Sequence, residues 1–192
     1  MAVYPIAFLI TAPVVGTYMQ NVGRKNMVFI GVVLMSLATL MFGLGSLGTS
    51  EKAFFIVSFI ARMLQGCGDA AIGVSISSII AIEFPENLEQ YMGYLNMSLG
   101  AGLCLGPLMG SIVFRYFNYI DTFYLFTAYI FIIGMISVFV IPSRVNKVVV
   151  ATEDSSTISF GFILDNKRSL TAIVLCIIAI ISIVYLDPIL AV

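Results

Sequence analysis

Residues 53–82 read AFFIVSFIARMLQGCGDAAIGVSISSIIAI, an apolar run with few polar side chains. This run is longer than the ~20 residues that a helix needs to cross the hydrocarbon core of a bilayer. Its centre contains Arg62, Gln65 and Asp69. At about 100° of rotation per residue, steps of three, four and seven residues return to the same face of a helix. The stretch therefore predicts a membrane-spanning helix with one polar stripe.

Two interpretations of this stripe stay open. Ionisable side chains at membrane depth are rare and face another helix, a partner or water, so the stripe is a candidate functional site. Alternatively, Arg62 and Asp69 only neutralise each other or neighbouring helices inside a bundle, because uncompensated charge in lipid is costly.

The composition is typical of a membrane protein. Of its 192 residues, 60% are apolar and 10% are charged, against ~25% charged in a typical soluble domain. The mean hydropathy is +1.09. A multi-spanning membrane protein is predicted, and the net charge of −1 without a basic patch argues against nucleic acid as a partner.

The absence of histidine excludes several kinds of catalytic and metal-binding site. With no His in the sequence, a Ser-His-Asp triad, an H-E-x-x-H zinc site and a His-ligated haem are excluded within this chain. Cys67, Cys104 and Cys176 lie in apolar runs without C-x-x-C spacing, so they are interpreted as small buried apolar residues. We expect no enzyme, no metal site and no cofactor.

Six apolar segments are long enough to be spans. Five of them precede a charged segment at 142–168, which predicts a linker, and the last follows it. The predicted spans are 1–19, 26–48, 53–82, 91–114, 122–141 and 169–186. A secretory signal is the alternative for the first span, but its positive charges follow the apolar stretch, which is the reverse of the usual polarity.

The basic residues predict the orientation of these spans. If the loop near residues 20–26 is cytoplasmic, that side collects six Lys and Arg residues and the other side two, as the positive-inside rule requires. The linker at 142–168 is then cytoplasmic. The first span begins on the non-cytoplasmic face, which is what a chain that lacks its first helix would show.

Three stretches carry motifs: residues 16–25 (GTYMQNVGRK), 62–71 (RMLQGCGDAA) and 102–111 (GLCLGPLMGS). They resemble, in order, the loop motif between helices two and three, the helix-four motif and the helix-five antiporter motif of the major facilitator superfamily of secondary transporters. Residues 83–87 (EFPEN) and 186–190 (LDPIL) are similar to sequences of its vesicular amine branch, which includes polyamine transporters.

The resemblance implies a fold and a domain organisation. The chain is expected to be an all-α membrane protein whose six helices correspond to helices two to seven of a twelve-helix fold. Residues 1–141 would form the N-terminal helical bundle without its first helix, 142–168 the cytoplasmic linker, and 169–192 the first helix of the C-terminal half. The membrane in which it resides stays open, vesicular or plasma membrane by resemblance.

The resemblance and the acidic side chains in apolar spans together assign site residues. The arginine of the helix-four motif, here Arg62, is associated with proton coupling, and the substrate and proton site is predicted at Arg62, Gln65, Asp69 and Asp187. Gating and close helix packing are assigned to Gly16, Gly23, Arg24, Lys25, Gly102, Gly106, Pro107 and Gly110. Gln20 and Asn21 depart from the Asp and Arg of the loop motif, and Asp69 stands where the family more often has a small residue.

Two hypotheses of function follow. The first is proton-coupled antiport of a small organic cation such as an amine or polyamine, because one carboxylate can bind either a proton or a cation and so couple their flows. The second is a structural or degenerate transporter-like subunit that packs with other membrane subunits and moves nothing. The partners are then protons and an organic cation, the lipid bilayer, and other subunits or the missing half of the transporter.

Overall fold

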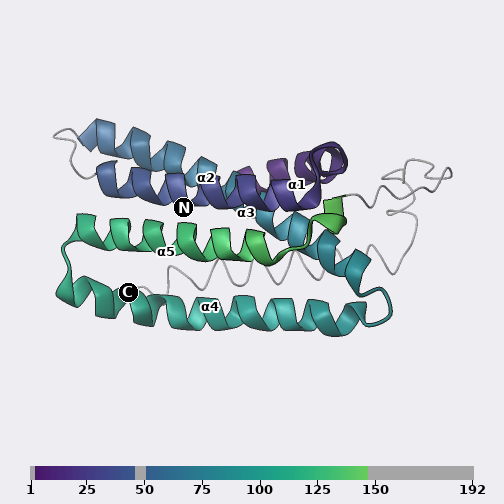
Figure 1. Cartoon of the computed structure of the whole chain (residues 1–192). Coiled ribbons are helices and arrows are strands. Elements are labelled where there is room, and N and C mark those ends of the chain that lie inside the picture. The colour runs from purple at the N-terminus through teal and green to yellow at the C-terminus, as the bar shows by residue number, and fades with distance from the viewer. Residues whose placement is uncertain (1–2, 46–50, 147–192) are drawn as a thin grey trace, which may run out of the picture. The chain divides into compact units, whose positions relative to one another are not determined.

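The computed structural model describes residues 3–45 and 51–146. The described part contains five α-helices and one short 3-10 helix (Figure 1). They are α1 (Val3–Val22), α2 (Arg24–Gly45), α3 (Glu51–Glu83), α4 (Leu88–Tyr116), α5 (Tyr119–Val140) and η1 (Ser143–Asn146).

All five helices are long and apolar enough to cross a membrane. They lie at the positions of the first five predicted spans, and most ends differ by only a few residues. α3 has 33 residues and starts at Glu51, two residues before the predicted start at residue 53. The predicted sixth span at 169–186 lies outside the described residues, as does most of the linker at 142–168.

α3 is the helix around which α1 and α2 are packed, and α2 packs in turn against α5. Figure 1 shows α1, α2 and α3 lying together. The buried residues of α3 are all small: Ala61, Gly66, Gly68, Ala70, Ala71 and Ser75. Small residues at a helix interface let two backbones approach closely, and van der Waals packing is then the main attraction between helices in lipid.

Two apolar clusters hold these helices together. Val15 and Met19 of α1 meet Met27 of α2 and Ala71 of α3 in the first cluster. The second joins α2 to α5 through Val28, Val32 and Val138, with isoleucines of α3 packed against it. The core of the described part therefore lies between α1, α2, α3 and α5.

α4 takes little part in this core. It contacts α3 and α5, but none of its residues is buried. Leu103 and Met97 are each 71% exposed. Pro107 lies inside the helix, which continues through it to Tyr116. Large exposed apolar side chains along a span are suited to lipid or to another membrane helix.

Candidate functional site

Asp69 lies half-buried near the middle of α3, where its carboxylate accepts a hydrogen bond from α1. The donor is the hydroxyl group of Tyr4, which meets the Oδ2 atom of Asp69. No other hydrogen bond to the Asp69 side chain occurs within the described residues. A single phenol group therefore fixes one oxygen of this carboxylate.

Arg62 points to different partners. Its Nη1 atom donates to Oε1 of Gln65 over 3.2 Å, and its guanidinium carbon lies 5.0 Å from the centre of the Phe42 ring. This is the distance range of a cation–π contact. Between the described side chains of Arg62 and Asp69 there is no ion pair, so the side chains that Arg62 contacts directly are Gln65 and Phe42.

Gly66 and Gly68 place Asp69 between two helices. Two residues apart, they point about 200° from each other around α3. A Cβ atom at Gly66 would lie 2.5 Å from the Tyr4 carbonyl oxygen, on α1. A Cβ atom at Gly68 would lie 3.0 Å from the Gly31 carbonyl oxygen, on α2. The two glycines thus let α1 and α2 approach opposite sides of α3.

Cys67, between these glycines, shares a hydrogen bond with Thr11 of α1, with 3.3 Å between Sγ and Oγ1. It is a free cysteine of intermediate burial. The expectation that the cysteines are buried is wrong for Cys104, which is exposed because α4 buries none of its residues. Cys176 lies outside the described residues.

The turn between α1 and α2 is built on Gly23, whose φ of +91° is in the left-handed region that favours glycine. Arg24, directly after it, is buried at 8% exposure. Its Nε atom donates to the Ser78 hydroxyl over 2.9 Å, and its Nη1 atom donates to the Val145 carbonyl over 3.3 Å. Arg24 therefore ties this turn to α3 and to η1.

Lys25 extends the same junction to α5. Its Nζ atom donates to the Ile141 carbonyl over 2.7 Å, just beyond the end of α5, a position where a cation is favoured by the helix dipole. Its backbone N–H donates to Oδ1 of Asn146 over 2.8 Å. Asn146 thus caps the start of α2 from a position 121 residues later in the chain.

The remaining residues predicted to act in gating and packing have no close neighbours among the described residues. Gly16 of α1 has nothing within 4 Å of the position of an added Cβ atom. The same holds for Gly102, Gly106 and Gly110 of α4, and Pro107 is exposed. Their assignment stays a prediction, and so does that of Asp187, which lies outside the described residues.

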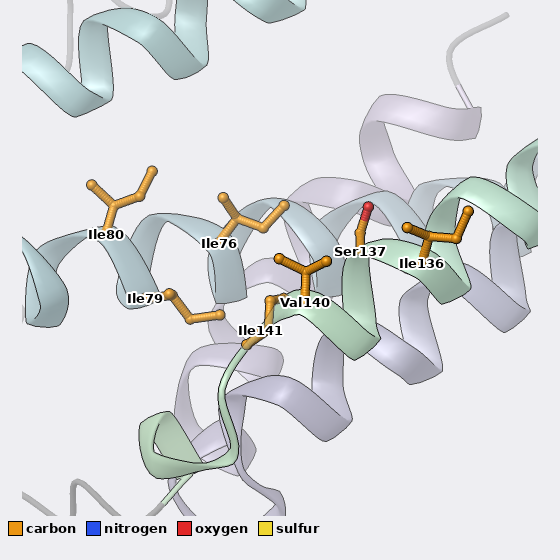
Figure 2. A pocket seen from close by; sticks show the side chains of 7 residues that line it. All are labelled: Ile76, Ile79, Ile80, Ile136, Ser137, Val140 and Ile141. Atoms are coloured by element: carbon orange, nitrogen blue, oxygen red, sulfur yellow. The ribbon is translucent and has the colours of Figure 1, made fainter.

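A groove of about 370 Å³ lies between α3 and α5 (Figure 2). Its walls are almost wholly aliphatic, with the Ser137 hydroxyl as the polar group: Ile76, Ile79, Ile80, Ile136, Ser137, Val140 and Ile141. None of Arg62, Gln65 and Asp69 lines it. The groove offers no charged group to a cation and is not the predicted site.

Sequence reasoning missed Tyr4, Phe42 and Asn146. Each touches a predicted site residue from another helix or from η1, and periodicity within one segment carries no information on such contacts. A hydroxyl-bearing aromatic residue in an apolar span is the one signal available for Tyr4, and Tyr18 of the same span carries it equally.

A family model described as Major Facilitator Superfamily matches residues 1–192. The chain belongs to this superfamily. It is a multi-pass integral membrane protein of a transporter family. The resemblance seen in the motifs is thereby confirmed, and the five described helices fit a part of the major facilitator fold.

Several curated proteins are similar to this chain. MFS-type transporter SLC18B1 of Mus musculus is 27% identical over 140 residues, 73% of this chain and 30% of that protein. Multidrug resistance protein 2 of Bacillus subtilis is 29% identical over 171 residues, 88% of this chain and 41% of that protein. The synaptic vesicular amine transporter of Homo sapiens is 31% identical over 140 residues, 71% of this chain and 26% of that protein.

The chain spans well under half the length of these relatives. No solved structure gives a significant match. Membership of the superfamily therefore rests on the sequence, and the five described helices supply the geometry for the residues discussed here.

Proposed function

We propose that this superfamily member is a secondary active transporter that exchanges protons for a small organic cation, of the amine or polyamine class. The observation that carries the proposal is Asp69, a carboxylate half-buried within a membrane span and not paired with the arginine on its own helix. The names of the relatives, which include vesicular amine and multidrug transporters, support a small-molecule substrate. They also favour a vesicular membrane.

The surroundings of Asp69 favour the exchange of a proton for an organic cation at its carboxylate. α2, which packs beside it, has no titratable side chain from Asn26 to Gly45, and α1 contributes a neutral phenol. A proton and an organic cation therefore compete for one negative charge. Each binding event releases the other ligand, which couples the two flows if the site opens alternately to the two sides.

Arg62 provides a fixed positive charge on the same helix, since a guanidinium stays protonated in proteins. Held by Gln65 and the Phe42 ring, it leaves Asp69 free to exchange its ligand. We assign the exchange of proton for cation to Asp69, proton sensing to Arg62, and a further contact with the substrate amine to Asp187.

The test is uptake of a radiolabelled amine into proteoliposomes that contain the intact protein, driven by an imposed proton gradient. Asp69→Asn and Asp187→Asn are each expected to lower gradient-driven uptake by about tenfold or more, because the amide removes the exchangeable charge. Asp121→Asn, at the exposed start of α5, is the matched control and should transport normally. Unchanged uptake by Asp69→Asn would contradict the proposal.

The alternative is a transporter-like structural subunit. The open glycine face of α4 supports it, because such a face is suited to a second membrane protein. Under this alternative, the wild-type protein would carry no amine under any imposed gradient, and Asp69→Asn would change only its assembly with a partner chain.

A further inference from the structure

Tyr4 is attached to α3 at two points. Its hydroxyl group donates to Oδ2 of Asp69. Its carbonyl oxygen faces Gly66, where an added Cβ atom would come within 2.5 Å. Gly66 precedes Asp69 by three residues, less than one helical turn. The contact with Gly66 therefore positions the backbone of Tyr4, and the hydrogen bond with Asp69 positions its hydroxyl group.

Few groups compete with Tyr4 for this carboxylate. On α3, Arg62 is engaged by Gln65 and Phe42, and Cys67 is engaged by Thr11. On α1 the other titratable side chain is Tyr18, which is exposed, and α2 has none from Asn26 to Gly45. Within the described residues, Tyr4 is the group that determines how the Asp69 carboxylate is oriented.

We propose that Tyr4 is the positioning residue of the cation site: it holds Oδ2 of Asp69 and thereby presents Oδ1 to the exchanging ligand. The inference rests on the proposed transport function and adds α1 to the site. A carboxylate held by one oxygen loses less rotational freedom when a cation binds the other, which favours binding. Removal of the hydroxyl group therefore weakens substrate binding more than it slows turnover.

Tyr4→Phe removes only the hydroxyl group. We expect its KM for amine uptake to rise about tenfold, the scale of one hydrogen bond to a charged group, with Vmax within about twofold of wild type. Tyr18→Phe, an exposed tyrosine on the same helix without a hydrogen bond in the described part, is the matched control and should keep both values.

A double variant tests whether Tyr4 acts through Asp69. Asp69→Glu displaces the carboxylate by one methylene group, so adding Tyr4→Phe to it should change KM by less than about twofold, because coupled residues are not additive. A full additional tenfold rise would show that Tyr4 acts elsewhere and would overturn the inference.

The outcomes separate the two proposals. If Asp69→Asn loses uptake while Tyr4→Phe keeps the wild-type KM, the positioning role is wrong and the transport function stands. If Asp69→Asn transports as well as wild type, Asp69 is not the exchange site and the proposed function is wrong on this point. The positioning role of Tyr4 is then wrong as well.

Discussion

Both α3 and α4 carry closely spaced glycines, yet the structure uses them differently. Gly66 and Gly68 of α3 lie against the backbones of α1 and α2. Gly102, Gly106 and Gly110 of α4 have nothing within 4 Å of an added Cβ atom. The regular four-residue repeat is on α4, but the close approach is on α3. Small-residue spacing thus shows where a helix is able to pack closely, while the neighbours decide whether it does.

The largest expected effect is at Gly66. Gly66→Ala should lower the free energy of unfolding by about 2–3 kcal/mol, because the new methyl group meets the backbone of α1, which cannot move without shifting that helix. Unfolding by sodium dodecyl sulfate in mixed micelles measures this. Gly73→Ala on the same helix, with nothing within 4 Å, is the control. Equal stability of the two variants would break the contrast between packed and open glycines.

A substitution at Gly23 compares two costs, that of an unfavourable backbone conformation and that of crowding against Asn146. Gly23→Ala should cost about 1–2 kcal/mol, because its φ of +91° is unfavourable for a residue with a Cβ atom. That atom would also lie 2.8 Å from the Asn146 side chain. The same unfolding assay applies. If the cost disappears when Asn146→Ala is added, crowding rather than backbone conformation is its cause.

The capping of α2 by Asn146 gives a smaller effect. Asn146→Ala should lower the free energy of unfolding by about 1 kcal/mol, since the Lys25 N–H loses its acceptor. Asn87→Ala is the matched control, because Asn87 stands at the N-cap of α4 without a side-chain cap hydrogen bond. Thermal unfolding in detergent compares the two, and an equal loss in both would show that the distant cap contributes nothing.

The smallest effect is expected on α4. Gly102→Ala, Gly106→Ala and Gly110→Ala should each leave stability unchanged or raise it by up to about 1 kcal/mol, because alanine is the better helix former and no contact is disturbed. Mixed-micelle unfolding of each single variant measures this. A loss of 2 kcal/mol or more would show that this face is packed in the intact protein, as its sequence motif predicts.

Much of the described fold was predictable, because a span needs only length and hydropathy, and both are local properties. The five spans follow from them. The polar stripe also predicted that Arg62 and Gln65 are neighbours, and they share a hydrogen bond. Periodicity did not predict that Asp69 turns to Tyr4, since that contact joins residues 65 positions apart on two helices.

The sequence by itself therefore determined the class of protein, the positions of the five described spans, and the superfamily through its motifs. Only the tertiary structure decided that Gly66 and Gly68 take the close contacts, that Tyr4 holds the Asp69 carboxylate, and that Asn146 caps α2. The physical reason is the separation along the chain over which each kind of information acts. Hydropathy and helical period act within one segment, whereas a hydrogen bond or a close approach between helices depends on how separate segments are placed in three dimensions.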